Sequence, residues 1–144
     1  MKLISLFILL TVLPINWEPD FNNAKKTAEQ NHKLILLNFS GSDWCGPCIV
    51  LRKDYLENAV FTEMADKNLV LVNADFPRKK KNTGTPEQVK RNEALAEIYN
   101  KEGSFPLTLL LDAQGKVLKT WHGKPDAAPE QWVEEINAIC ESRK

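Results

Sequence analysis

The apolar residues of this chain gather in short runs separated by polar stretches. Residues 34–39, 69–74 and 107–111 are almost continuously apolar. Runs of this length and composition predict β-strands that are covered on both faces. Residues 116–122 follow a turn signal at 112–115, which predicts a fourth strand paired with the third as a hairpin.

Between these runs the apolar residues recur at spacings of three and four, which is the period of an α-helix. The pattern predicts helices at residues 20–31, 49–57, 87–99 and 129–140, and a short helical turn at 61–67. Strands that alternate with helices imply parallel pairing, and the late hairpin adds antiparallel strands. The fold class is therefore α/β, with a central mixed β-sheet flanked by helices.

Local signals support two of the helix boundaries. The Pro19-Asp20 pair marks the start of the first helix. Thr85 is the expected N-cap of the third long helix, with Pro86 at its first helical position. Gly103 is expected to end that helix.

The start of the chain has a different character. Met1 and Lys2 precede an apolar stretch, residues 3–13, which is shorter than the roughly 20 residues that span a bilayer. It predicts a signal peptide; an uncleaved anchor and a buried helix are the alternatives. We assign residues 1–16 to the signal peptide or N-terminal anchor and residues 17–144 to one folded domain. Export would make the domain periplasmic or secreted, where disulfides persist.

Composition narrows the choice of function. The chain has 144 residues, 43% of them hydrophobic, and its 19 basic residues balance 19 acidic ones. A neutral chain gives no general reason to expect nucleic acid as a partner. Three cysteines are too few for a disulfide-stapled scaffold, and indicate one working pair and one single thiol.

The pair is Cys45 and Cys48, which lie between a predicted buried strand and a predicted helix. Cys45 therefore falls at the first turn of the helix, where free N–H groups favour a thiolate. Cys48 lies one turn further and can close a small disulfide with Cys45, so the pair can exchange electrons with other thiols. Gly46 leaves room for an approaching polypeptide, and Pro47 stiffens the ring that the cysteines share.

Two other interpretations of the pair are a structural disulfide and half of a metal site. A metal site would need further ligands, and His32, His122 and Cys140 each stand alone in the sequence. We therefore expect no metal and no cofactor, and we expect Cys140 to be a buried free thiol, with a regulatory or intermolecular thiol as the alternative.

The five residues Trp44 to Cys48 read Trp-Cys-Gly-Pro-Cys, and in this the chain resembles the thioredoxin family. The resemblance extends over residues 20–142 and is to the exported thioredoxin-like branch. It implies a thioredoxin fold with Cys45 as nucleophile and Cys48 as resolving cysteine. It also implies that Pro106 is a cis proline against the active site.

The same resemblance implies that the backbone of Phe105 pairs with a bound substrate strand. Trp44 is expected to shield the sulfurs and to offer a flat apolar surface, or else to serve core packing alone. The exchange mechanism requires that the Cys45 sulfur be exposed to a second polypeptide.

The chain departs from the family pattern at two places: Leu107 stands directly after Pro106, where the family has a small residue or Thr, and the strand before the motif carries Asn38. Asn38 stands on the strand where thioredoxins carry a buried aspartate, and an amide cannot take a proton from Cys48. Asp43, immediately before Trp44, is a candidate for that carboxylate, although a loop residue of this kind is more often solvated. Residues 78–81 are four consecutive cations, which predict either a solvated loop or a docking patch for an acidic partner.

The function predicted from the sequence is thiol–disulfide exchange outside the cytosol, in the reducing direction. The partners would be disulfide-containing or thiol-containing proteins and a membrane electron-donor protein. The main alternative is a non-catalytic peptide-binding or chaperone module that uses the groove beside Trp44 and Pro106. A metal-binding protein is a third, weaker alternative.

Overall fold

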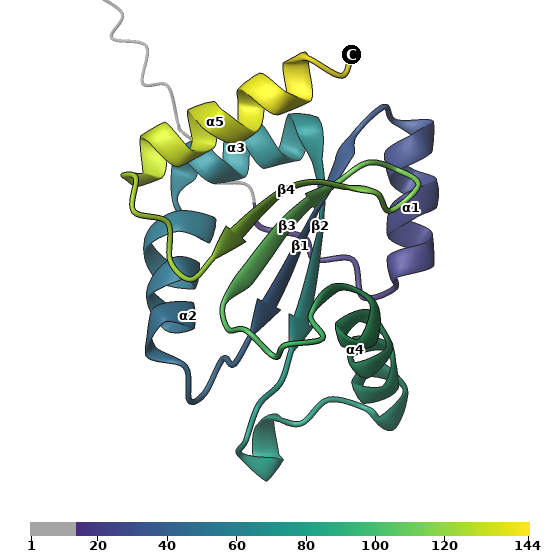
Figure 1. The fold of residues 1–144 in the computed structure, drawn as a ribbon, viewed down its shortest axis with the longest axis vertical. Helices are drawn as coiled ribbons and strands as arrows, with labels where there is room; N and C mark the ends of the chain where they lie inside the picture. The colour runs from purple at the N-terminus through teal and green to yellow at the C-terminus, as the bar shows by residue number, and fades with distance from the viewer. Residues whose placement is uncertain (1–13) are drawn as a thin grey trace, which may run out of the picture.

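The fold was analysed in a computed structural model, which describes residues 14–144 (Figure 1). The strands are β1 (Leu34–Ser40), β2 (Leu69–Asp75), β3 (Leu107–Leu111) and β4 (Val117–His122). The α-helices are α1 (Phe21–Gln30), α2 (Gly46–Val50), α3 (Ala59–Asn68), α4 (Pro86–Tyr99) and α5 (Pro129–Glu141). A π-helix, η1 (Leu51–Leu56), continues α2, and a 3₁₀ turn, η2 (Lys80–Asn82), precedes α4.

The four strands form one mixed sheet in the order β2-β1-β3-β4. β1 is parallel to β2, whereas β3 is antiparallel to both β1 and β4. The mixed sheet predicted from the sequence is confirmed. β3 is antiparallel to β1 although a helix connects it to β2, because the chain leaves β2 and enters β3 at the same end of the sheet (Figure 1).

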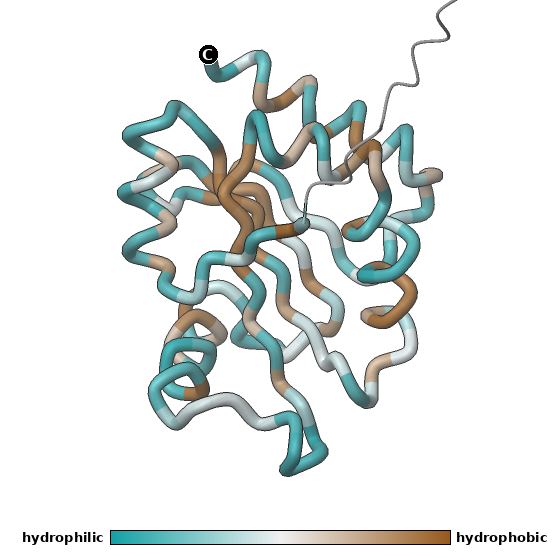
Figure 2. The backbone as a smooth tube through the Cα atoms, turned by 180° about the vertical axis from the view of Figure 1, so that it is seen from behind, coloured by the Kyte–Doolittle hydropathy of each residue, from teal (hydrophilic) through white to brown (hydrophobic). Residues whose placement is uncertain are grey.

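Helices cover both faces of the sheet, which explains the unbroken apolar runs. Leu34 and Leu36 of β1 pack in a core with residues of η1, α3 and α5. Ile35, Leu37 and Phe39 alternate with them and pack against α1 and α4. Successive strand residues point to opposite faces, so a sheet covered twice needs apolar residues at every position. Figure 2 shows these apolar strands at the centre of the molecule, with more polar helices around them.

The start signal predicted for α1 and the N-cap predicted for α4 are both confirmed. The Asp20 carboxylate accepts hydrogen bonds from the backbone N–H groups of Asn22 and Asn23, at 2.8 and 3.0 Å. The Thr85 hydroxyl accepts one from the Gln88 N–H at 3.2 Å, and Pro86 is the first residue of α4.

Two helix predictions need correction. Residues 61–67 are not a short turn but lie within α3, a ten-residue helix whose Phe61, Met64 and Ala65 are buried. Gly103 does not end α4, which stops at Tyr99. Instead the buried Asn100 side chain bonds both the N–H and the C=O of Ser104, each at 2.9 Å, and turns the chain toward β3.

The segment before α1 covers the outer edge of the sheet. Trp17 forms a parallel bridge with Leu71 of β2, and the Glu18 N–H donates to the Leu71 carbonyl at 2.8 Å. The predicted signal peptide or anchor lies mostly outside the described residues. Within residues 14–144, no helix is long and apolar enough to cross a membrane.

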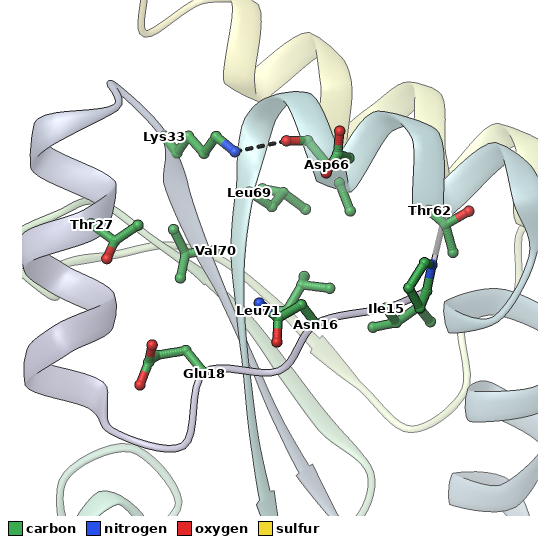
Figure 3. A pocket seen from close by; sticks show the side chains of 12 residues that line it. Ile15, Asn16, Glu18, Thr27, Lys33, Thr62, Asp66, Leu69, Val70 and Leu71 are labelled. Carbon is green, nitrogen blue, oxygen red and sulfur yellow. Dashed lines mark hydrogen bonds between the residues drawn. The ribbon is translucent and has the colours of Figure 1, made fainter. Parts of the chain in front are cut away.

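A hollow of about 200 Å³ lies beside this segment, between α1, α3 and the start of β2 (Figure 3). Lys33 crosses its rim and donates to the Asp66 carbonyl at 2.7 Å. Its strand residues are Leu69, Val70 and Leu71, at the beginning of β2. The cysteine pair follows the far end of β1, so the hollow is separate from the site described next.

Candidate active site

Cys45 is the N-cap of α2, as the sequence predicts. Its sulfur accepts a hydrogen bond from the Cys48 N–H at 3.3 Å, and the two cysteines form a disulfide across a Cα–Cα distance of 5.2 Å. That Cα separation lies in the normal range for disulfides. The helix start therefore brings the two sulfurs together without displacing the backbone.

A second backbone donor faces the pair. The Gly41 N–H lies 3.5 Å from the Cys48 sulfur, within the reach of a hydrogen bond to sulfur. Each sulfur thus has one N–H group directed at it, and both lie where the helix dipole is positive. This environment stabilises a sulfur anion once the disulfide is reduced.

The two cysteines are less exposed than the sequence led us to expect. Cys45 retains 6% and Cys48 3% of the accessible surface in this disulfide-bonded state. The Cys45 sulfur is bonded to the Cys48 sulfur and accepts the Cys48 N–H, so the pair lies against the start of α2. Gly46 and Pro47 between them are exposed, and a Cβ at Gly46 would meet no atom within 4 Å. The open approach to the disulfide is therefore over Gly46 and Pro47.

Trp44 forms an aromatic wall next to Cys45. Its indole N–H donates to the Phe76 carbonyl at 2.7 Å, and its ring meets Phe105 edge-to-face at 5.5 Å. A Cβ at Gly41 would overlap the indole, so a glycine is needed there for the ring to lie in place. Trp44 is half-buried, which fits both an exposed apolar surface and packing against Phe105.

The segment before β3 reaches the same end of the sheet. The Phe105–Pro106 bond is cis, which confirms that prediction, and Pro106 is buried. Pairing of Phe39 with Leu107 places Pro106 level with Ser40, the last residue of β1, where the cysteine loop begins. Among the described residues, the backbone N–H and C=O of Phe105 have no hydrogen-bond partner. They are free to pair with another extended chain.

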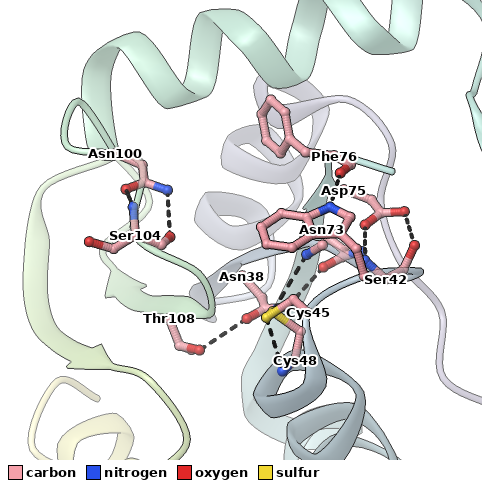
Figure 4. The surroundings of a disulfide bond; sticks show 12 residues. Asn38, Ser42, Cys45, Cys48, Asn73, Asp75, Phe76, Asn100, Ser104 and Thr108 are labelled. Carbon is pink, nitrogen blue, oxygen red and sulfur yellow. Dashed lines mark hydrogen bonds between the residues drawn. A yellow bond between two sulfur atoms is a disulfide. The ribbon is translucent and has the colours of Figure 1, made fainter. Parts of the chain in front are cut away.

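Asn38 belongs to a buried network of uncharged groups close to the disulfide (Figure 4). It is 4% exposed, and its amide N–H donates to the Asn73 side-chain oxygen at 2.9 Å. The Thr108 hydroxyl donates to the Asn38 carbonyl oxygen at 3.1 Å. None of these three side chains titrates, so this network holds its geometry without exchanging protons. Asn73 and Thr108 were not recognised in the sequence, because only the strand register brings them beside Asn38.

Asp43 does not supply a carboxylate to the sulfurs. Its two oxygens accept hydrogen bonds from the backbone N–H groups of Arg78 and Lys79 and from the Asn82 amide, each at 2.9 Å. These bonds, that of the Arg78 N–H foremost, lower the pKa of Asp43. The carboxylate therefore fixes the loop after β2 instead of serving as an acid or base.

The same loop places a cation over the aromatic wall. The Arg78 guanidinium carbon lies 3.9 Å from the centroid of the Trp44 ring. A cation–π contact at an exposed position of this kind is worth about 0.5–1 kcal/mol. Sequence reasoning recognised residues 78–81 as a charged run but not this contact, since nothing in the local sequence links Arg78 to Trp44.

Cys140 lies in the last turn of α5 and is 4% exposed, which confirms the prediction of a buried free thiol. Burial raises its pKa to about 11. In residues 14–144, no three His, Cys, Asp or Glu side chains come together as a metal site would require.

A family model described as thioredoxin-like matches residues 16–113. The disulfide bond reductase DsbH of Chlamydia pneumoniae is 38% identical over 104 residues, which are 72% of this chain and 60% of that relative. The thioredoxin-related protein DsbJ of the same organism is 27% identical over 97 residues, 67% of this chain and 27% of the relative. The chain thus spans less than two thirds of the length of either curated relative.

A solved structure described as DsbH oxidoreductase has a TM-score of 0.82 and 29% sequence identity to this chain. The similarity covers 98% of this chain and 94% of that structure. The sheet order, the flanking helices and the Cys45–Cys48 disulfide agree with this likeness. The chain has a thioredoxin fold and belongs to the thioredoxin-like family.

Proposed function

We propose that this protein is a thiol–disulfide oxidoreductase that reduces disulfides in protein substrates outside the cytosol. The observation that carries the proposal is the Cys45–Cys48 disulfide at the start of α2, with a backbone N–H directed at each sulfur. A pair in this position can hold a thiolate when reduced and a stable disulfide when oxidised.

The reaction begins with the reduced pair. The Cys45 thiolate attacks one sulfur of a substrate disulfide, forms a mixed disulfide and releases the other substrate sulfur as a thiolate. The Cys48 thiolate then attacks the Cys45 sulfur, which closes the Cys45–Cys48 disulfide and frees the second substrate sulfur. Two electrons pass to the substrate, which takes up two protons as its thiols form. A further dithiol must return two electrons to the pair, and we assign that role to a membrane electron-donor protein.

The residues around the cysteine pair would each contribute differently to substrate binding. The free N–H and C=O of Phe105 would pair with an extended substrate segment, as an edge strand does. Pro106 and the Trp44 ring would form the walls beside that segment. Gly46 would leave the disulfide open to attack, because a Cβ there meets no atom within 4 Å, and Pro47 beside it is exposed.

The reducing direction and the location have separate support. The Gly-Pro spacer resembles that of the reducing members of the family, and the relative DsbH is named as a disulfide bond reductase. The apolar stretch at residues 3–13 is typical of an exported protein.

Catalysed reduction of insulin by dithiothreitol tests the activity. We expect the wild-type protein to accelerate the reaction, Cys45→Ser to abolish the acceleration, and Cys140→Ser to leave it unchanged. No acceleration by the wild-type protein would defeat the proposal. Peptide binding that persists after both active-site cysteines are replaced would then support the non-catalytic binding module.

A redox titration of the Cys45–Cys48 pair tests the direction. A potential near about −270 mV is that of a reductant, and one near about −120 mV that of a strong oxidant. We expect the pair to titrate near the first value. A result near the second would reverse the direction while leaving the exchange chemistry in place.

A further inference from the structure

The loop after β2 carries several positively charged side chains close together. Residues 78–81, which we call the cationic loop, are Arg78, Lys79, Lys80 and Lys81, and all four are exposed. Within residues 14–144, none of them lies within 4.0 Å of a carboxylate oxygen in an ion pair, whereas other cations do, such as Arg52 with Glu57. The chain as a whole is neutral, so this charge is a local feature.

The cationic loop is held in place against the cysteine segment. Asp43 accepts the backbone N–H groups of Arg78 and Lys79, and the Asn82 amide adds a third bond. The Asp43 carboxylate is therefore engaged with the loop backbone and the Asn82 amide, and within residues 14–144 no side chain of the cationic loop forms an ion pair. The η2 turn projects at the end of the sheet from which α2 also starts (Figure 1).

Arg78 brings the charge to the edge of the active site. Its guanidinium lies over Trp44, the residue directly before Cys45. A guanidinium stacked by one face keeps its N–H edge available, and that edge suits a carboxylate with two parallel hydrogen bonds. A substrate segment that passes Trp44 to reach the disulfide would meet this edge first.

We propose that the cationic loop docks an acidic segment of the substrate polypeptide next to the disulfide that Cys45 attacks. The inference rests on the proposed function and adds a class of substrate to it. Clustered charge of one sign raises the rate of association with the opposite charge and selects among partners. The contact of Arg78 with Trp44 favours a polypeptide over a lipid surface, because it places the charge beside the reacting sulfurs.

The test uses three synthetic peptides of equal length, each with one internal disulfide flanked by acidic, neutral or basic residues. The reduced protein is mixed with each peptide, and the second-order rate of reduction is divided by the rate with dithiothreitol, which removes the peptide's own reactivity. At low salt we expect the acidic peptide to react about tenfold faster than the neutral one, and the basic peptide to react slowest. The preference should vanish at about 1 M salt, where the Debye length is about 3 Å.

Two variants with equal changes of charge locate the effect. Lys80→Glu with Lys81→Glu should remove or reverse the preference and leave the neutral peptide unaffected. Lys67→Glu with Lys116→Glu should keep the preference, because these exposed residues adjoin the starts of β2 and β4, at the opposite end of the sheet.

The outcomes distinguish failure of the docking proposal from failure of the proposed exchange activity. Equal rates for the three peptides, or a preference that survives Lys80→Glu with Lys81→Glu, would overturn docking and leave the exchange activity standing. Failure to reduce any peptide would instead overturn the proposed function. Flotation with phosphatidylserine vesicles forms a separate arm: binding that depends on Lys80 and Lys81, without any preference among peptides, would assign the loop to a membrane surface and overturn the proposal.

Discussion

The cysteines at the two ends of the sheet are almost equally buried and yet differ in chemistry. Cys45, Cys48 and Cys140 retain 6%, 3% and 4% of their accessible surface. The first two lie at the start of a helix with an N–H group directed at each sulfur. Cys140 lies in the last turn of α5, where the helix dipole is negative and burial raises the thiol pKa to about 11. Similar burial therefore does not imply similar reactivity: an N–H group faces each sulfur of the pair, whereas desolvation dominates at Cys140.

The largest expected effect is a difference in alkylation rate. In the reduced protein at pH 7, we expect iodoacetamide to modify Cys45 about 100-fold faster than Cys140. A thiol of pKa about 11 has almost no thiolate at this pH, whereas an ordinary cysteine has a few per cent. Mass spectrometry of timed samples measures both sites at once. In urea the two rates should converge, and similar rates in the folded protein would break the comparison.

The second effect is on stability at alkaline pH. The pKa of Cys140 is raised from 9.0 to about 11 in the fold, so the fold favours the neutral thiol. This contribution is fully present below about pH 9 and is lost as the pH rises through about 11. We expect the free energy of unfolding to fall by up to about 2 kcal/mol over this range, measured by urea denaturation of the oxidised protein.

Cys140→Ala is the control for that measurement. Burial also raises the pKa of Tyr99, so part of the alkaline loss is shared by wild type and variant. The slope of stability against pH should be smaller in Cys140→Ala. Identical slopes would show that the Cys140 thiol keeps an ordinary pKa.

The smallest expected effect concerns the open approach to the reactive pair. Gly46→Ala should leave stability within about 0.5 kcal/mol of wild type, because the new methyl group meets no atom of the protein. It should slow insulin reduction a few-fold, since the methyl group would stand where a substrate backbone approaches. Gly84→Ala, at an exposed loop glycine with ordinary contacts to Gln88, is the matched control. Unchanged insulin reduction in Gly46→Ala would show that the substrate does not approach over this residue.

Much of the fold could be predicted because its signals are local. The apolar runs and the capping residues Asp20 and Thr85 gave the strands and helix starts, since burial on two faces and N-cap hydrogen bonds each leave a short sequence pattern. The cysteine pair and the cis Pro106 came from a motif and from the family resemblance. The direction of β3 left no such pattern, because it depends on which end of the sheet the preceding loop occupies.

The surroundings of the pair could be predicted only in part. Asn38 was recognised, but its partners Asn73 and Thr108 lie 35 and 70 positions away in the sequence. Asp43 was considered as an acid–base group, whereas its carboxylate binds backbone groups of the loop after β2. Contacts of this kind arise from tertiary structure, and no single stretch of sequence encodes them.

The bridge from Trp17 to Leu71 limits how far the N-terminal segment can be truncated. A truncation that keeps Trp17 and Glu18 also keeps their backbone contacts with Leu71 at the outer edge of β2. A truncation that removes them would free the Leu71 carbonyl on the outer edge of β2, and unpaired edge-strand groups can pair with a second copy of the chain. A truncated form that lacks Trp17 and Glu18 should therefore associate with itself more readily than a form that keeps them.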